Sequence, residues 1–197
     1  IHIDRFSSCR DLEVKRRIWR CEGELVNTEV KREMVILGID PGTAITGYGL
    51  IQKQGNHLKR IAFGAILTVP ETHMALRLQR IYRELQKIIE QYRPDVMAVE
   101  ELFFNKNVRT ALTVGQARGV VLLAGAEAGL NIIEYTPLQV KMAVVGYGRA
   151  EKRQVQEMVR ILLCLNEIPK PDDAADALAI AICHANSYKQ LSVLNKQ

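Results

Sequence analysis

The chain has 197 residues, 48% of them hydrophobic, which is the size and composition of one ordinary globular domain. It has no run of about 18 uninterrupted apolar residues and no N-terminal pattern of a signal peptide, so we expect a cytoplasmic protein with no membrane partner. The cysteines Cys9, Cys21, Cys164 and Cys183 form no CxxC pair and have no histidine at metal-ligand spacing, which argues against a zinc site or a disulfide framework. The net charge of +5 and pI near 9.1 permit a polyanionic partner without identifying one.

The first 33 residues differ from the rest of the chain. They mix charges of both signs with scattered apolar residues and do not begin with methionine, so we expect a flexible or non-native extension. Met34 is a plausible natural start. We expect one folded domain over residues 34–190 and a short tail over residues 191–197, and the folded domain carries most of the excess positive charge.

The pattern becomes regular after Met34. Apolar runs and a Gly-Asn turn predict three antiparallel strands, at Val35–Ile39, Thr46–Gln52 and Leu58–Leu67. Helical spacing of apolar residues predicts a helix over His73–Tyr92, which "RPD" ends. The buried run "VMAVE" then predicts a strand over Val96–Glu100.

The second half alternates helices with one more strand. Helices are predicted at Arg109–Ala128, after the cap Thr136 and Pro137, at Ala150–Leu163, and from Pro171 to about Tyr188, with a strand at Asn131–Tyr135. This order predicts an α/β fold in which a mixed sheet of about five strands has helices on both faces.

Two of the predicted strands end on an acidic residue, Asp40 in "GIDPGT" and Glu100 in "VMAVE". Both strands are near-continuous apolar runs, so both are expected to be central, and open α/β sheets place their ligands beyond the carboxyl ends of the strands. A solvated acid is the alternative for either residue alone. Two matching strand ends favour a shared site.

The last predicted helix contributes further acids in "DDAADALAIAI", residues 172–182. Asp172 has a ready interpretation as a helix cap, and Asp173 as a favourable first-turn acid. Asp176 shares the apolar face of Ala177, where a charge costs several kcal/mol unless it is paired. The helix offers no nearby lysine or arginine, so a metal ion is the economical partner for these acids.

Four carboxylates without histidine or thiolate suit a hard divalent ion, Mg²⁺ or Mn²⁺. Sites of this kind typically hold two ions about 3.5 to 4 Å apart and catalyse displacement at phosphorus. The acids therefore predict phosphoryl chemistry. His184, near the end of the same helix, is more simply a structural residue than a metal ligand.

Five blocks in order closely resemble the RuvC family of bacterial Holliday-junction resolvases, over about Met34 to Tyr188. The blocks are "GIDPGT…TGYG" (38–49), "VEELFFNKN" (99–107), "GQARGV" (115–120), "VKMAVVGYGRAEKRQVQ" (140–156) and "DDAADALAIAICH" (172–184). The resemblance implies an RNase H-like fold and a Mg²⁺-dependent homodimer that makes two symmetrical nicks in a four-way DNA junction during recombination and repair.

Carried over by motif, the resemblance implies that Asp40, Glu100, Asp173 and Asp176 are the catalytic acids and metal ligands. The implied products are 5′-phosphate and 3′-hydroxyl ends, and the implied partners are the RuvA and RuvB branch-migration proteins. A homodimer suits two cuts on a symmetric junction. Gly115 and Gly119 form a small-residue stripe that the resemblance favours as a dimer surface.

Basic and aromatic residues predict the contacts with DNA. The segment "LFFNKNVR" (102–109) mixes aromatic, basic and amide residues, and the resemblance gives Phe103 a role in base stacking. The predicted phosphate contacts are Lys106, Arg109, Lys141, Arg149, Lys152 and Arg153. For each basic residue alone, a solvated surface charge is the alternative.

Three other interpretations compete. An actin-like ATPase would need a second glycine-rich phosphate loop and more chain, and the sequence has no GxxxxGK loop. A smaller RuvC-like nuclease acting on RNA shares the Asp…Glu…Asp layout but lacks the "VEELFFNKN" and "AEKRQVQ" blocks. A non-catalytic junction-binding protein would have to bind metal through all four acids without cutting.

Overall fold

The computed structural model describes residues 33–101 and 108–194. The chain divides between Val30 and Lys31 into two units, and all described residues belong to the second. The predicted extension, apart from Glu33, lies outside the described residues, as do Cys9 and Cys21. Within the described part of the chain, no helix is long and apolar enough to cross a membrane.

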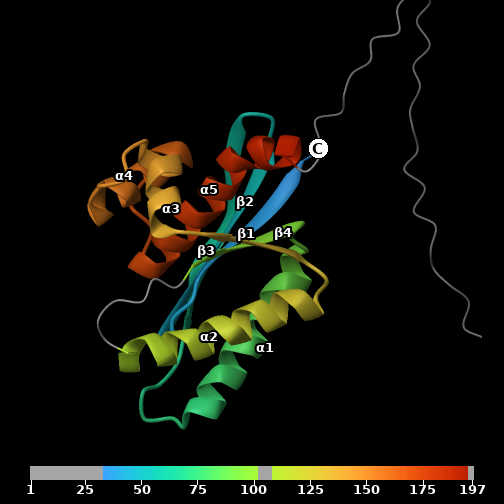
Figure 1. The fold of residues 1–197 in the computed structure, drawn as a ribbon, viewed down its shortest axis with the longest axis vertical. Coiled ribbons are helices and arrows are strands. Elements are labelled where there is room, and N and C mark those ends of the chain that lie inside the picture. The colour runs from blue at the N-terminus through green and yellow to red at the C-terminus, as the bar shows by residue number, and fades with distance from the viewer. Residues whose placement is uncertain (1–32, 102–107, 195–197) are drawn as a thin grey trace, which may run out of the picture. The chain divides into compact units, whose positions relative to one another are not determined.

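The second unit is built on one five-stranded sheet (Figure 1), in the order β3-β2-β1-β4-β5. Its strands are β1 (Met34–Asp40), β2 (Ile45–Gln54), β3 (His57–Leu67), β4 (Val96–Glu100) and β5 (Asn131–Tyr135). The first three strands are antiparallel neighbours, whereas β4 pairs in parallel with both β1 and β5. The predicted mixed sheet is confirmed, with β1 and β4 next to each other at its centre.

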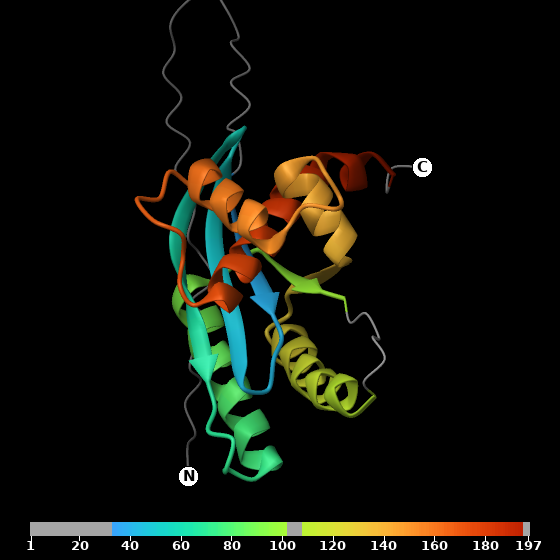
Figure 2. The same ribbon diagram turned by 90° about the vertical axis from the view of Figure 1, so that its left-hand side faces the viewer.

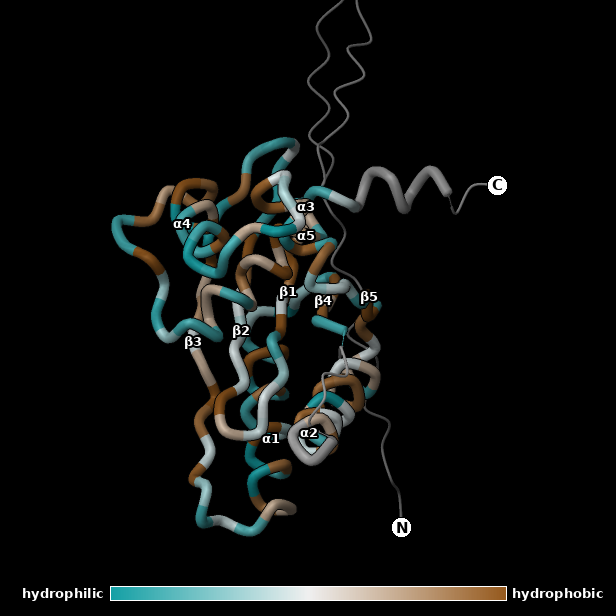
Figure 3. The backbone as a smooth tube through the Cα atoms, turned by 60° about the vertical axis from the view of Figure 1, so that its left-hand side comes forward, coloured by the Kyte–Doolittle hydropathy of each residue, from teal (hydrophilic) through white to brown (hydrophobic). Residues whose placement is uncertain are grey.

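Helices cover both faces of this sheet, as predicted. They are α1 (Met74–Tyr92), α2 (Val108–Glu127), α3 (Pro137–Val145), α4 (Lys152–Leu162) and α5 (Asp172–Leu194). Leu37 and Ile39 of β1 face α1 and α2, whereas Ile36 faces α3, α4 and α5, because successive side chains of a strand alternate between faces. Figure 2 shows the two helical layers on either side of the sheet, and Figure 3 shows the hydrophobic strands between them.

Several predicted helix boundaries are wrong by a few residues. Helix α4 begins at Lys152 instead of Ala150, because Glu151 is its N-cap in a capping box with Gln154. Helix α5 continues to Leu194, so it passes the predicted end near Tyr188 and enters the predicted tail. The predicted cap Thr136 is confirmed, since its side chain accepts a hydrogen bond from the Gln139 backbone N–H.

Three glycines let α5 lie almost directly on the sheet. A Cβ atom at Gly38 of β1 would lie 2.1 Å from the Ala177 carbonyl oxygen, and one at Gly47 of β2 would lie 2.0 Å from the Asp173 carbonyl oxygen. A Cβ at Gly49, which pairs with Gly38 in the β1–β2 ladder, would meet Leu178 at 2.8 Å. The glycines of "GIDPGTAITGYG" thus form a groove that sets the distance between α5 and the sheet.

Candidate active site

Asp40 and Glu100 occupy equivalent places at the ends of the two central strands. Each is the last residue of its strand, and the parallel register pairs Ile39 of β1 with Val99 of β4 just before them. Asp40 lies two residues after Gly38, whose absent side chain would point at α5, so strand alternation directs Asp40 to the α5 face. Glu100 follows Ala98 in the same way. The fold therefore brings these two predicted acids together.

Asp173 and Asp176 reach the same place from the first turns of α5. The contact between Gly47 and the Asp173 backbone fixes this end of the helix, and Gly47 is the ladder partner of Asp40. Asp173 and Asp176 are both partly buried. The four predicted acids thus converge from three elements that are distant in sequence.

The charges of these acids act on one another. Burial, and then the negative charges of Glu100, Asp176 and Asp173, raises the pKa of Asp40 from 3.8 to about 7, against a lowering effect of Lys152. Burial and the charge of Asp176 also raise the pKa of Glu100. Crowded, desolvated carboxylates of this kind are stabilised by a cation.

A lysine supplies part of that positive charge. Lys152, at the start of α4, places its Nζ atom 3.0 Å from Asp176 Oδ2 and 3.4 Å from Asp172 Oδ2. Burial raises the pKa of Asp176, and its hydrogen bond with Lys152 opposes that rise. The α5 sequence has no nearby basic residue, and the basic partner of Asp176 comes from another helix. Asp172, predicted as a cap, lies within α5 and pairs with Lys152.

The donor chemistry of the four acids fits a hard metal ion, because all four offer oxygen ligands. Burial and repulsion between the carboxylates also raise the pKa of Asp40 and Glu100, which a bound cation would offset. Among the described residues, no three Asp, Glu, His or Cys side chains are arranged to hold a metal ion in this structure. In this structure Asp176 is instead paired with Lys152.

The predicted DNA contacts fall into two groups. Phe103 and Lys106 lie outside the described residues, and of Arg109 only its place in α2 is described. Lys141 of α3 lies near enough to Glu100 to oppose the rise in its pKa. Arg149 and Arg153 are exposed on either side of the start of α4, next to Lys152. Of the described basic residues, Lys141 and Lys152 therefore lie close enough to act on the acids, and Arg149 and Arg153 are near Lys152 in sequence.

The predicted dimer glycines lie on α2. Gly119 is exposed, and a Cβ added there would meet nothing within 4 Å, whereas Gly115 is partly buried. On the exposed side of α2, Leu112 and Leu123 are 65% and 51% exposed, two turns before and one turn after Gly119. This apolar stripe, defined as Leu112, Gly119 and Leu123, is open to solvent within the described residues.

His184 lies in the core. Its Nδ1 atom is 2.8 Å from the hydroxyl oxygen of Tyr135 at the end of β5, and both residues are buried. Burial, and then the charge of Lys53, lowers the pKa of His184 to about 4. The environment is that of a neutral structural histidine.

A hydroxyl network fixes the turn after Asp40, and sequence reasoning did not find it. The Thr46 hydroxyl donates to the Gly42 carbonyl at 2.6 Å, and the Thr68 hydroxyl donates to the Thr43 carbonyl at 2.5 Å. Thr46 is completely buried. Its place one residue into a strand, directly after the turn, was the available signal.

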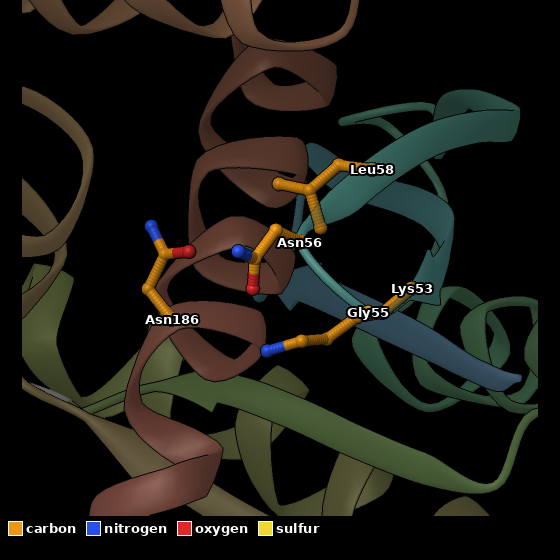
Figure 4. A pocket seen from close by; sticks show the side chains of 5 residues that line it. All are labelled: Lys53, Gly55, Asn56, Leu58 and Asn186. Atoms are coloured by element: carbon orange, nitrogen blue, oxygen red, sulfur yellow. The ribbon is translucent and has the colours of Figure 1, made fainter. Parts of the chain in front are cut away.

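An open hollow of about 210 Å³ lies between the β2–β3 hairpin and α5 (Figure 4). It is lined by Lys53, Gly55, Asn56, Leu58 and Asn186. Lys53 donates a hydrogen bond to the Ala185 carbonyl, and Asn186 donates one to Ala143 at 3.0 Å. Thirteen helical residues, roughly 20 Å, separate Asn186 from Asp173, so this hollow is separate from the acids.

A mixed sheet of this order, with carboxylates at the ends of its two central strands and at the start of the helix laid across them, defines an RNase H-like nuclease. Residues 36–184 match the family described as crossover junction endodeoxyribonuclease RuvC. The chain belongs to the RuvC family, whose members are metal-dependent nucleases.

Similar proteins agree with this assignment. The RuvC of Heliobacterium modesticaldum is 70% identical over 154 residues, covering 78% of this chain and 95% of the relative. That of Halothermothrix orenii is 65% identical over 156 residues, covering 79% and 94%. Thermus thermophilus RuvC, solved in complex with a Holliday junction substrate, has a TM-score of 0.76 at 39% identity, covering 81% of this chain and 96% of that chain. The yeast mitochondrial resolvase Ydc2 shares the fold, with a TM-score of 0.60 at 15% identity and 87% of both chains covered.

Proposed function

We propose that this chain resolves four-way DNA junctions by cutting them. Each chain has one carboxylate site, formed by Asp40, Glu100, Asp173 and Asp176. The observation that supports this most is the convergence of these acids from β1, β4 and α5 in a member of the RuvC family. The junction-bound Thermus thermophilus relative supports the choice of substrate. We propose that a chain acting on DNA junctions works in the cytoplasm.

The four acids would hold Mg²⁺, two ions for each site, with Mn²⁺ as a substitute. When bound, the metal supplies activation of the attacking water and stabilisation of charge on the phosphate, and the products carry 5′-phosphate and 3′-hydroxyl ends. Asp40 is partly buried and belongs to a central strand, so it is proposed to orient the rest of the site. Lys152, which pairs with Asp176 in this structure, would keep a positive charge beside the phosphate when Asp176 binds metal.

DNA binding is proposed to use the basic residues around the acids. Lys141 on α3 and Lys152 on α4 interact with the acids, and Arg149 and Arg153 are exposed on either side of Lys152 in sequence. With Lys106 and Arg109 they would follow the phosphates, and Phe103 would stack on an unpaired base. Removing one such phosphate contact is expected to weaken binding to all junction sequences alike.

We propose a homodimer formed through the apolar stripe of α2. Leu112 and Leu123 expose apolar surface on either side of Gly119, where the absence of a side chain lets another helix approach closely. Two copies related by a two-fold axis would present two sites to a symmetric junction. The RuvA and RuvB branch-migration proteins are proposed as partners on the basis of the family alone.

A synthetic four-way junction with Mg²⁺ tests the function. Symmetric nicks that Asp40→Asn abolishes, while junction binding without metal is retained, support the proposal. Binding without any nicking by the unaltered chain would support a non-catalytic junction-binding protein instead. Preferential cutting of RNA or RNA–DNA hybrids over the junction would support the alternative of an RNA-directed nuclease.

A further inference from the structure

Arg118 of α2 joins the ends of two strands beneath the candidate active site. Its Nε atom donates a hydrogen bond to the Glu100 carbonyl oxygen at 3.3 Å, and its Nη2 forms an ion pair with Glu134 of β5. The Arg118 side chain is only 17% exposed. An arginine in this position satisfies two acceptors on different strands from one side chain.

These contacts come from the side of the sheet opposite to the acids. Strand alternation directs Glu134 to the α2 face, whereas the next residue, Tyr135, lies in the core with α5. Tyr135 is the register partner of Glu100, and its carbonyl accepts a hydrogen bond from the Glu101 N–H at 2.8 Å. The peptide that leaves β4 at Glu100 is therefore held by β5 on one side and by Arg118 from the α2 face.

We propose that Arg118 is a positioning residue, which holds the Glu100 backbone so that the Glu100 carboxylate keeps its place among the four acids. The N–H of the Glu100–Glu101 peptide is held by β5, so the orientation of the peptide further depends on what its Glu100 carbonyl oxygen meets. A small shift of a catalytic group costs about 10²-fold in rate. The inference rests on the proposed function of Glu100 as a metal ligand.

Arg118 also connects the site with the proposed dimer surface. It precedes Gly119, the centre of the apolar stripe, in the same turn of α2. A partner helix against that stripe would therefore restrain the helix that carries the arginine. The same side chain would then transmit the position of α2 to the end of β4.

The test compares Arg118→Gln, Arg118→Lys and Glu134→Gln with the unaltered chain. Three quantities are measured: Mn²⁺ binding by electron paramagnetic resonance, junction binding without metal, and the single-turnover nicking rate. We expect Arg118→Gln to weaken Mn²⁺ binding and slow nicking by about 10-fold or more, the size of effect typical when a group that orients a ligand is removed. Junction binding should remain within about twofold. Arg118→Lys, which keeps the charge near Glu134 but loses the Nε donor, should fall close to Arg118→Gln, and Glu134→Gln should be milder.

Arg160→Gln is the matched control, because Arg160 pairs with Glu157 on the surface of α4. It should change none of the three quantities. All measurements are made below the unfolding temperature of each variant, and Arg118→Lys serves alone if Arg118→Gln does not fold. Unaltered Mn²⁺ binding and nicking in the folded Arg118 variants would overturn the inference, as would a Glu134→Gln defect equal to that of Arg118→Gln. Failure of the unaltered chain to nick would instead overturn the proposed function.

Discussion

Replacing Asp40 with asparagine should make the metal-free protein more stable, by an amount that grows with pH. In the folded protein, burial and the neighbouring acids raise the pKa of Asp40 from 3.8 to about 7. This difference between the folded and unfolded pKa values, at about 1.4 kcal/mol for each pKa unit, corresponds to about 4 kcal/mol of lost stability once Asp40 is ionised in both states. Asparagine has nearly the same shape and carries no charge, so it removes this cost.

The pH dependence of the stability follows from the number of protons that Asp40 binds in the folded and the unfolded states. Between pH 3.8 and about 7 the unfolded Asp40 is ionised while the folded Asp40 keeps its proton, so the folded state binds more protons. Stability therefore falls as the pH rises through this window and becomes level above it. Asparagine does not titrate, so the difference between Asp40→Asn and the unaltered chain should widen by about 2 to 3 kcal/mol from pH 5 to pH 8.

Urea denaturation with a metal chelator, at pH 5 and pH 8, measures this difference. Mg²⁺ added at pH 8 should then stabilise the unaltered chain more than Asp40→Asn, because the ion relieves the same repulsion and needs the carboxylate. Asp40→Asn should also lose nicking. A stability difference that is the same at both pH values, or an asparagine variant that is less stable at pH 8, would refute the reasoning.

Three further predictions concern the surroundings of the site. Gly47→Ala should destabilise the fold by about 3 kcal/mol in urea denaturation and abolish nicking, because its Cβ would lie 2.0 Å from the Asp173 carbonyl oxygen. Lys152→Gln should slow single-turnover nicking yet strengthen Mn²⁺ binding up to about fivefold, since a half-exposed ion pair with Asp176 no longer competes with the metal. His184→Gln should reduce the loss of stability on acidification, because the folded pKa of about 4 makes the unaltered protein lose up to about 3 kcal/mol as the pH falls from 6.5 to 4.

The first two of these predictions have matched controls. Gly119→Ala should leave the monomer folded, because a Cβ there meets nothing within 4 Å. Lys87→Gln removes an exposed ion pair with Glu84 on α1 and should affect neither nicking nor Mn²⁺ binding. Unchanged stability in Gly47→Ala, or weaker Mn²⁺ binding in Lys152→Gln, would contradict the contacts described for α5 and α4.

The sheet and its acids were predictable because their signals are local. Apolar runs that end in Asp40 and Glu100 identify central strands, and alternation with period two then sends both acids to one face. The Thr136 cap was equally predictable from a threonine followed by proline. Features that depend on a few neighbouring residues can be inferred without knowing how the elements meet.

Contacts between distant elements were not predictable in this way. The ion pair between Lys152 and Asp176 could not be inferred from the α4 sequence, because it depends on how α4 and α5 pack against each other. The sequence shows Arg118 only as part of the "GQARGV" block. Its role could not be inferred, because its two acceptors, Glu100 and Glu134, lie on strands β4 and β5. The end of α5 at Leu194 was missed because the mixed residues after Tyr188, which begin with Lys189 and Gln190, indicate a tail as readily as a helix.

The close packing of α5 on the sheet glycines means that the set of acids is complete only when the last helix has docked. Asp40 is made with the first strand, whereas Asp173 and Asp176 belong to the last helix and take their places only when α5 docks on Gly38 and Gly47. A chain still growing on the ribosome therefore carries an incomplete set of acids. The proposed site therefore cannot assemble all four acids before α5 has been synthesised and has docked on the sheet.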